Sequence, residues 1–227
     1  MNRLMPKNVS AKMASLAMPI AAKSNLKHKL GERSRNVIRE AALQLMAKVG
    51  YAGTSISAIA KTSGLPASSL YWHFGSKKGL LSSVAEDSAA RWLGFIPNWK
   101  ELRGNRPERL DAMLRAVFRE MERQPEPVRL ILMLYLELGQ SDPKAVSIVR
   151  RMRKSVLAKF RPAIEALLEH DDSPKKEMKI DDLCNFTLTY CNGCFVDHQI
   201  DPGGTNFSIR CDQLLASLLA ISHVDSV

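Results

Sequence analysis

The stretch that decides the fold is Ile56–Phe74, which reads ISAIAKTSGLPASSLYWHF. Two short segments with helical spacing, Ile56–Thr62 and Ala67–Phe74, flank the break SGLP. Gly64 can adopt the left-handed backbone of a tight turn at little cost, and Pro66 suits the start of a following helix. The pattern predicts a helix-turn-helix, a motif whose second helix lies in the major groove of DNA.

The two faces of the second segment differ in chemistry. Leu70 completes an apolar seam with Ile59 and Leu65. The opposite face carries small and aromatic side chains, namely Ala67, Ser68, Ser69, Tyr71, Trp72 and His73. Large aromatics are poorly used on a solvent-facing surface unless a partner covers them, and serines can hydrogen-bond bases or phosphates. Two interpretations stay open: a DNA-reading surface, or a three-helix core with Tyr71 and Trp72 packed against the next domain.

Helical segments on both sides complete this N-terminal unit. Glu32–Val49 has apolar residues at three- and four-residue steps, and Gly50 ends it. Ser55 can cap the first motif helix, and Ser76 can cap a fourth helix, Lys77–Phe95.

The positive charge lies in the same part of the chain. The sequence has 33 Lys and Arg against 23 Asp and Glu, a net charge of +10. All of the excess lies in the first 91 residues, whereas the remainder is balanced. A basic unit is the electrostatic footprint of a protein that binds a polyanion. Basic faces can also be merely solvated, so the charge is informative because it coincides with the helix-turn-helix pattern.

The first 30 residues allow three interpretations. Met13–Ala22 is moderately apolar and follows basic residues, as in a secretory leader, but Pro19 interrupts it. A flexible tail, or a gene model whose true start is Met13 or Met18, fits the residues better. Such a tail is either a minor-groove arm or a disordered segment. Four cysteines without a convincing leader favour a reduced, cytoplasmic protein, and no apolar run reaches the ~18–20 residues that span a bilayer.

The rest of the chain is also helical in pattern. The expected helices are Glu108–Arg123, Val128–Leu138, Ser141–His170, Ile180–Ile200 and Asn206–His223. We see no strand pair and no internal repeat. The sequence therefore predicts an all-α protein with three parts, which are a basic flexible tail (1–30), a helix-turn-helix domain (31–95) and a larger regulatory domain (96–227).

Three runs in the N-terminal unit resemble a known family. They are GYAGTSISAIA at 50–60, SGLP at 63–66 and LYWHFGSKKGLL at 70–81. Together they resemble the DNA-binding domain of the tetracycline-repressor (TetR) family, over residues 32–82. The resemblance implies a homodimer of about nine helices per subunit. It also implies that the N-terminal domain docks on a pseudo-palindromic operator and that the C-terminal domain binds a small inducer.

Carried over by position, the resemblance assigns DNA contacts to nine residues: Ser55, Ser57, Ala67, Ser68, Ser69, Tyr71, Trp72, His73 and Lys77. Lys77 matches the phosphate-binding lysine of the family. Pro66 departs from the common serine cap of the recognition helix, and Ala67 stands where longer polar base-readers are frequent. The operator sequence is therefore hard to predict.

No ligand residue can be carried over in the C-terminal half. Methionine and aromatic side chains suited to an apolar or amphipathic effector are Met113, Phe118, Met133, Tyr135, Phe160, Phe186 and Tyr190. Plain core packing is the alternative for each of them. The resemblance places the dimer interface on Ile180–Ile200 and Asn206–His223, where we expect an apolar stripe of Leu214, Leu215, Leu218 and Ile221.

One further group shares a helix face, namely Cys184, Cys191, Cys194 and His198. Soft ligands on one face can bind a metal or sense oxidants, with Cys211 as a further ligand. The outer members lie about 20 Å apart along a helix, too far for one ion, so only Cys191, Cys194 and His198 are close enough to share one. We therefore favour a small-residue packing seam and expect no metal and no cofactor.

These features favour a DNA-binding transcriptional regulator, a repressor that a small effector releases from its operator. A helical enzyme with Cys191 and Cys194 as a redox pair is a second hypothesis. Neither thiol would have the helix N-terminus that usually lowers a cysteine pKa, and no catalytic grouping is evident. A third hypothesis is a helical interaction protein whose basic domain binds acidic partners.

Overall fold

The computed structural model describes the backbone of residues 20–138 and 143–223. Within these ranges the chain forms nine α-helices and one short 3-10 helix, and no strand, so the predicted all-α class is confirmed. The helices are α1 (Ile20–Gly53), α2 (Ile56–Ser63), α3 (Ala67–Phe74), α4 (Lys77–Phe95), α5 (Arg106–Arg123), α6 (Glu126–Leu138), α7 (Pro143–Leu167), α8 (Lys176–Ile200) and α9 (Phe207–His223). The 3-10 helix, Trp99–Glu101, has no counterpart among the predicted elements.

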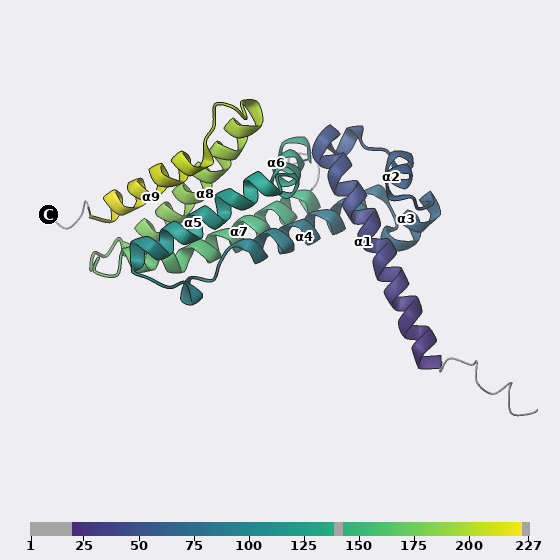
Figure 1. Ribbon diagram of the computed structural model, residues 1–227, viewed down its shortest axis with the longest axis horizontal. Helices are drawn as coiled ribbons and strands as arrows, with labels where there is room; N and C mark the ends of the chain where they lie inside the picture. The colour runs from purple at the N-terminus through teal and green to yellow at the C-terminus, as the bar shows by residue number, and fades with distance from the viewer. Residues whose placement is uncertain (1–19, 139–142, 224–227) are drawn as a thin grey trace, which may run out of the picture.

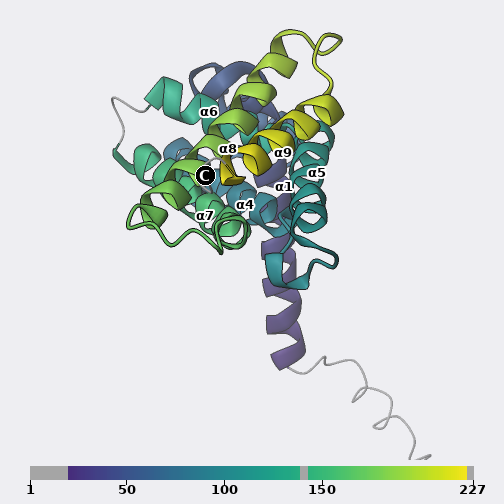
Figure 2. The same ribbon diagram turned by 90° about the vertical axis from the view of Figure 1, so that its left-hand side faces the viewer.

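The first helix is longer than predicted. It begins at Ile20, so residues 20–30, which we expected in a flexible tail, are helical. This segment is rich in alanine, lysine and leucine, which favour helix over coil. Figures 1 and 2 show that the N-terminal part of α1 projects away from the rest of the molecule. The predicted minor-groove arm falls mainly on residues 1–19, which lie outside the described part of the chain.

Gly50 breaks α1 as predicted, because its φ of 77° is left-handed. The short turn Tyr51–Gly53 follows the break and leads into α2. The Thr54 hydroxyl donates to the Gly50 carbonyl oxygen at 2.7 Å. This turn connects the core of the N-terminal domain with the helix-turn-helix.

Local signals set the geometry of α2, α3 and α4. Ser55 Oγ accepts a hydrogen bond from the Ala58 N–H at 3.1 Å and caps α2. Gly64 closes α2 with a φ of 68°. Ser76 Oγ accepts from the Gly79 N–H at 3.0 Å and caps α4. Ile59 is fully buried beneath this motif.

The C-terminal domain is a helical bundle connected to the N-terminal domain by two helices. Figure 1 shows α4 running from α3 into the bundle of α5, α7, α8 and α9, and α6 lying between the bundle and α1. One continuous core joins both halves, from Ile38 in α1 to Leu218 in α9. An Asn105–Glu108 capping box fixes the start of α5.

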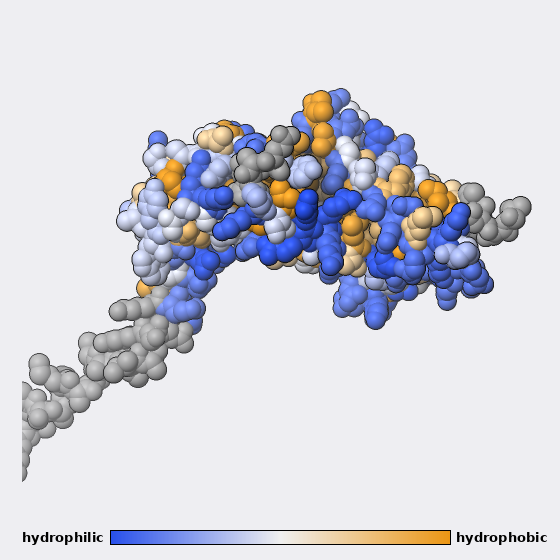
Figure 3. Space-filling model, turned by 180° about the vertical axis from the view of Figure 1, so that it is seen from behind, coloured by the Kyte–Doolittle hydropathy of each residue, from blue (hydrophilic) through white to orange (hydrophobic). Residues whose placement is uncertain are grey.

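The face opposite to the view of Figure 1 is mainly polar. From behind, hydrophilic residues cover most of the molecule and hydrophobic ones form small, separate patches (Figure 3). Within the described ranges, none of the helices combines the length and apolar character needed to cross a bilayer.

Candidate DNA interface and ligand cavity

The recognition helix α3 keeps its aromatic face in solvent. Trp72 is 77% exposed and Tyr71 is 54% exposed, whereas Leu70 on the opposite side is 2% exposed. Ser68 is exposed, and Ala67 and Ser69 are partly buried. The alternative in which Tyr71 and Trp72 pack against the next domain is therefore wrong for this chain.

Two serines at the start of α2 are also part of the candidate interface. Ser55 and Ser57 are both exposed, and their hydroxyl oxygens are 2.9 Å apart. Since Ser55 Oγ also caps α2, its position is fixed before any ligand arrives. Two hydroxyls held in this way are suited to phosphate or base-edge contacts.

His73 ends the exposed face and is neutral near pH 7. Its ring packs edge-on against Trp72, with centroids 4.5 Å apart. Burial and the nearby Arg35 guanidinium lower the pKa of His73, and Glu32 opposes them only in part. A neutral imidazole can donate one hydrogen bond to a phosphate but adds no positive charge.

Lys77 supplies a cation at the first turn of α4. Its Nζ lies 4.3 Å from the centroid of the Tyr51 ring, which orients the ammonium group. The helix dipole at this helix start also favours an anion. The nine sequence-predicted DNA residues thus come from α2, α3 and the start of α4, which are adjacent in Figure 1.

A contact between domains that the sequence did not indicate joins this region to α6. Glu137, near the end of α6, accepts hydrogen bonds through Oε2 from the Tyr51 and Ala52 N–H groups at 3.0 and 3.4 Å. The carboxylate lies so close to Gly50 that an added Cβ would overlap Oε1. Gly50 is therefore required both for its positive φ and for the approach of Glu137.

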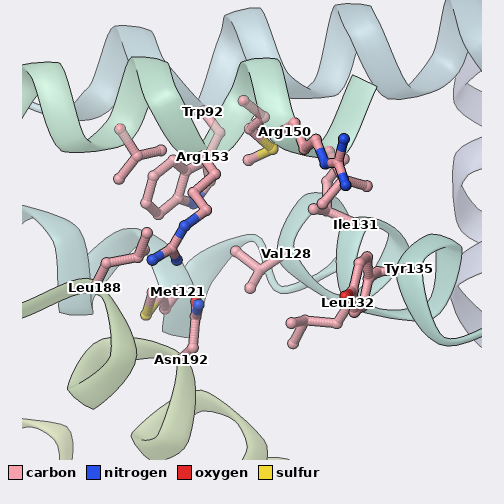
Figure 4. Close-up of a pocket in the computed structure, with 13 residues that line it drawn as sticks. Trp92, Met121, Val128, Ile131, Leu132, Tyr135, Arg150, Arg153, Leu188 and Asn192 are labelled. Carbon is pink, nitrogen blue, oxygen red and sulfur yellow. The ribbon is translucent and has the colours of Figure 1, made fainter. Parts of the chain in front are cut away.

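The C-terminal domain contains an open cavity of about 570 Å³, a size typical of small-molecule sites. It is lined by residues of α4 to α8: Trp92, Met121, Val128, Ile131, Leu132, Tyr135, Val149, Arg150, Met152, Arg153, Val156, Leu188 and Asn192. Figure 4 shows these side chains around the space between α6, α7 and α8. The lining is apolar apart from two arginines, Asn192 and the polar ends of Trp92 and Tyr135.

Of the seven residues that the sequence suggested for a pocket, Tyr135 lines this cavity. Met113, Phe118 and Phe160 are almost completely buried in the core instead. Met133 is partly buried on α6, and Phe186 and Tyr190 contact each other on α8 with ring centroids 6.1 Å apart. The seven residues were chosen by residue type alone, and residue type does not distinguish a side chain packed in the core from one in a cavity wall.

The apolar stripe expected at the dimer interface faces inward. Leu214 and Leu218 are fully buried within the subunit, where α9 packs on α5. Leu215 is partly buried and Ile221 is 44% exposed. The prediction that Leu214 and Leu218 contribute to the dimer interface is wrong, because periodicity identifies an apolar face but not what covers it.

The cysteine group is a packing seam. All four thiols are buried, and burial raises the pKa of Cys184 and of Cys211 to about 11 and that of Cys191 further. The His198 ring packs on Phe207, with centroids 4.6 Å apart. In the part of the chain that the structure describes, no cluster of three or more His, Cys, Asp or Glu side chains is arranged to hold a metal ion.

Known proteins resemble both halves of the chain. Residues 38–84 match the model of bacterial regulatory proteins of the tetR family. The transcriptional regulator BetI of Rhizobium meliloti is 27% identical over 144 residues, which are 62% of this chain and 69% of BetI. A transcriptional regulator of Pseudomonas aeruginosa PAO1 superposes with a TM-score of 0.70 and 17% identity, over 85% of this chain and 93% of its own.

FadR of Bacillus subtilis, solved in complex with stearoyl-CoA, has a TM-score of 0.66 and 16% identity, over 81% of this chain and 97% of its own. At such identities the solved structures show the fold, and the regulator relationship comes from the helix-turn-helix match and from BetI. With the recognition helix exposed on the surface of the matched region, residues 38–84 form a DNA-binding domain of the tetR family of bacterial regulatory proteins.

Proposed function

We propose that this regulator is a homodimeric repressor that binds a pseudo-palindromic DNA operator and leaves it when a small effector occupies the cavity. The observation that carries the proposal is the exposed face of α3, where Tyr71 and Trp72 have no partner in the described part of the subunit that would cover them. Such a face is suited to the major groove, and Lys77 beside it to the phosphate backbone. The enzyme hypothesis loses its candidate groups, because Cys191 and Cys194 are buried thiols with raised pKa values.

Two helices connect the cavity with the DNA-binding domain. The helix α4 begins at Lys77 beside α3 and carries Trp92 in the cavity wall. The helix α6 contributes Val128 and Tyr135 to the wall and then Glu137 to the turn after Gly50. A ligand that fits the cavity in only one arrangement of these helices favours that arrangement, and the spacing of the two recognition helices changes with it.

The surface of α8 supports a dimer. Phe186, Gly193, Val196 and Ile200 recur at three-, four- and seven-residue steps and face solvent in the single subunit. A Cβ at Gly193 would meet no atom within 4 Å, so this position is open to a close partner helix. We propose that α8 and the exposed Ile209 and Ile221 of α9 form a two-fold interface in the cytoplasm, where the operator lies.

The test is selection of bound genomic fragments with the purified full-length protein, followed by footprinting. We expect two inverted half-sites about one helical turn apart, or somewhat more. A reporter with this site over its promoter should gain expression when the regulator is deleted. Binding without sequence preference would refute the operator and support the third hypothesis, and lower expression on deletion would refute repression.

A further inference from the structure

We infer that the effector is an anionic amphiphile: a molecule with an apolar body and a carboxylate or comparable anion that Arg150 or Arg153 binds at the solvent side of the cavity. This inference rests on the proposed function, since it names the class of ligand for the same cavity. The two arginines differ from the others of α7 in what they contact.

The four arginines of α7 divide into two groups. Arg151 forms an ion pair with Glu86 at 2.8 Å, and Arg161 forms ion pairs with Glu165 and Asp181 at 2.8 and 2.6 Å. Among the described residues, Arg150 has no carboxylate partner, and Arg153 bonds only to the neutral amide oxygen of Asn185 at 2.7 Å.

Whether an arginine of α7 forms an ion pair depends on the face of the helix that carries it. Arg150 and Arg153 are three residues apart and so share one face of α7, which is the face that borders the cavity. The cavity lining contains no Asp or Glu among the described residues. Two guanidinium groups without a carboxylate partner among the described residues therefore border an apolar space.

The positions of the two guanidinium groups suit an elongated ligand. Figure 4 shows the Arg153 side chain beside Trp92, reaching toward Leu188 and Asn192. The Arg150 guanidinium lies on another side of the cavity, near Ile131. Both arginines are exposed, so they lie at the solvent side and leave the apolar interior to the ligand's body.

Trp92 provides a second, independent sign of a ligand. The residue is 4% exposed, and its indole N–H is buried without a hydrogen-bond partner among the described residues. An unpaired buried donor costs free energy, and Trp92 lies in the cavity wall, so a ligand oxygen that reached this N–H would satisfy it. The arginines, the indole N–H and the apolar wall together favour an acceptor-bearing anion and disfavour a cation.

The experiment compares three ligands that share one alkyl chain and differ in charge: decanoate, 1-decanol and decyltrimethylammonium. Their binding to the full-length protein without DNA is measured by calorimetry. We expect decanoate to bind about tenfold or more tightly than decanol, because each charged hydrogen bond contributes several-fold at an exposed site, and the ammonium compound to bind most weakly. In Arg150→Gln/Arg153→Gln, decanoate should lose this advantage while decanol binding stays unchanged.

Arg151→Gln is the matched control, because this arginine is paired with Glu86 and does not line the cavity. It should keep the preference for decanoate. Equal affinity for the three ligands, preference for the cation, or no saturable binding of decanoate would overturn the inference. If decanoate binds through the arginines but fails to release the operator, the ligand class stands and the effector-release proposal fails.

Discussion

The contact between Gly50 and Glu137 can be tested by a double-mutant cycle on the free energy of unfolding. Glu137→Ala removes the acceptor for the Tyr51 and Ala52 N–H groups. Both N–H groups can then bind water, so we expect a loss of about 1 kcal/mol. Gly50→Ala places an ordinary residue at a φ of 77° and a ψ of 170°, a region almost restricted to glycine, which costs about 1–3 kcal/mol. The added Cβ also displaces the carboxylate, so the same hydrogen bonds are lost and the total is about 2–4 kcal/mol.

In the double variant these hydrogen bonds can be lost only once. The combined destabilisation should therefore be about 1 kcal/mol smaller than the sum of the two single effects. The assay is urea unfolding at one fixed protein concentration, because dimerisation makes stability depend on concentration. Glu122→Ala, which removes an exposed carboxylate of α5 far along the chain from this turn, is the control and should be additive with Gly50→Ala. Additivity of Gly50→Ala and Glu137→Ala within about 0.3 kcal/mol would show that the contact does not connect the domains.

Four further measurements test the DNA interface and the buried side chains. Tyr71→Ala should weaken operator binding by about 1–3 kcal/mol in a mobility-shift titration while the dimer stays intact. Phe95→Ala removes another exposed aromatic side chain and should leave operator binding unchanged. An equal loss in both variants would count against α3 as the helix that contacts the DNA bases. Lys77→Ala should weaken binding to operator and random DNA alike and make the slope of log K against log salt shallower by about one unit; an unchanged slope would show that Lys77 does not contact phosphate. The pKa of His73 is lower in the folded chain than its usual 6.5, so the unfolded chain binds more protons as the pH drops through 6.5. The free energy of unfolding should therefore fall over this range, and His73→Gln should reduce the fall. An equal fall in the variant would show that His73 is not the group responsible. All four cysteines should react with a thiol reagent only after unfolding, because all are buried, and rapid labelling of the native protein would indicate an exposed thiol.

The N-terminal domain was predictable because short-range chemistry determines it. Gly50, Gly64 and the caps Ser55 and Ser76 act within a few residues of the chain, and the structure places each where the sequence indicated. The start of α1 at Ile20 was not predicted, because its composition fits both a helix and a solvated tail. The segment Ile20–Leu30 contains no strong break but is highly basic. High charge suggests a solvated tail, whereas the lysines and alanines that supply this composition also favour a helix.

The C-terminal site was less predictable because its parts are far apart in sequence. Trp92 comes from the end of α4, Val128 from α6, Arg153 from α7 and Leu188 from α8. Each of these residues resembles an ordinary core or surface residue when considered alone. Two observations indicated the ligand class. Among the described residues, Arg150 and Arg153 have no carboxylate partner, and the Trp92 indole N–H has no hydrogen-bond partner. Only the folded chain shows which charges are paired.

A contact between groups distant in sequence also explains why we expect Glu137 to contribute more to stability than its exposure suggests. An exposed carboxylate near a helix end is usually solvated and contributes little. Here the carboxylate is brought to two backbone N–H groups of a segment more than 80 positions away in sequence, and it can approach them because Gly50 has no side chain. Since α6 also forms part of the cavity wall, a ligand that shifts α6 must act on the turn before α2. The contact of Glu137 with this turn is therefore one route from the cavity to the DNA-binding domain, beside the packing of α6 on α1. Substitutions at this contact should alter the response to effector more than the affinity for either ligand alone.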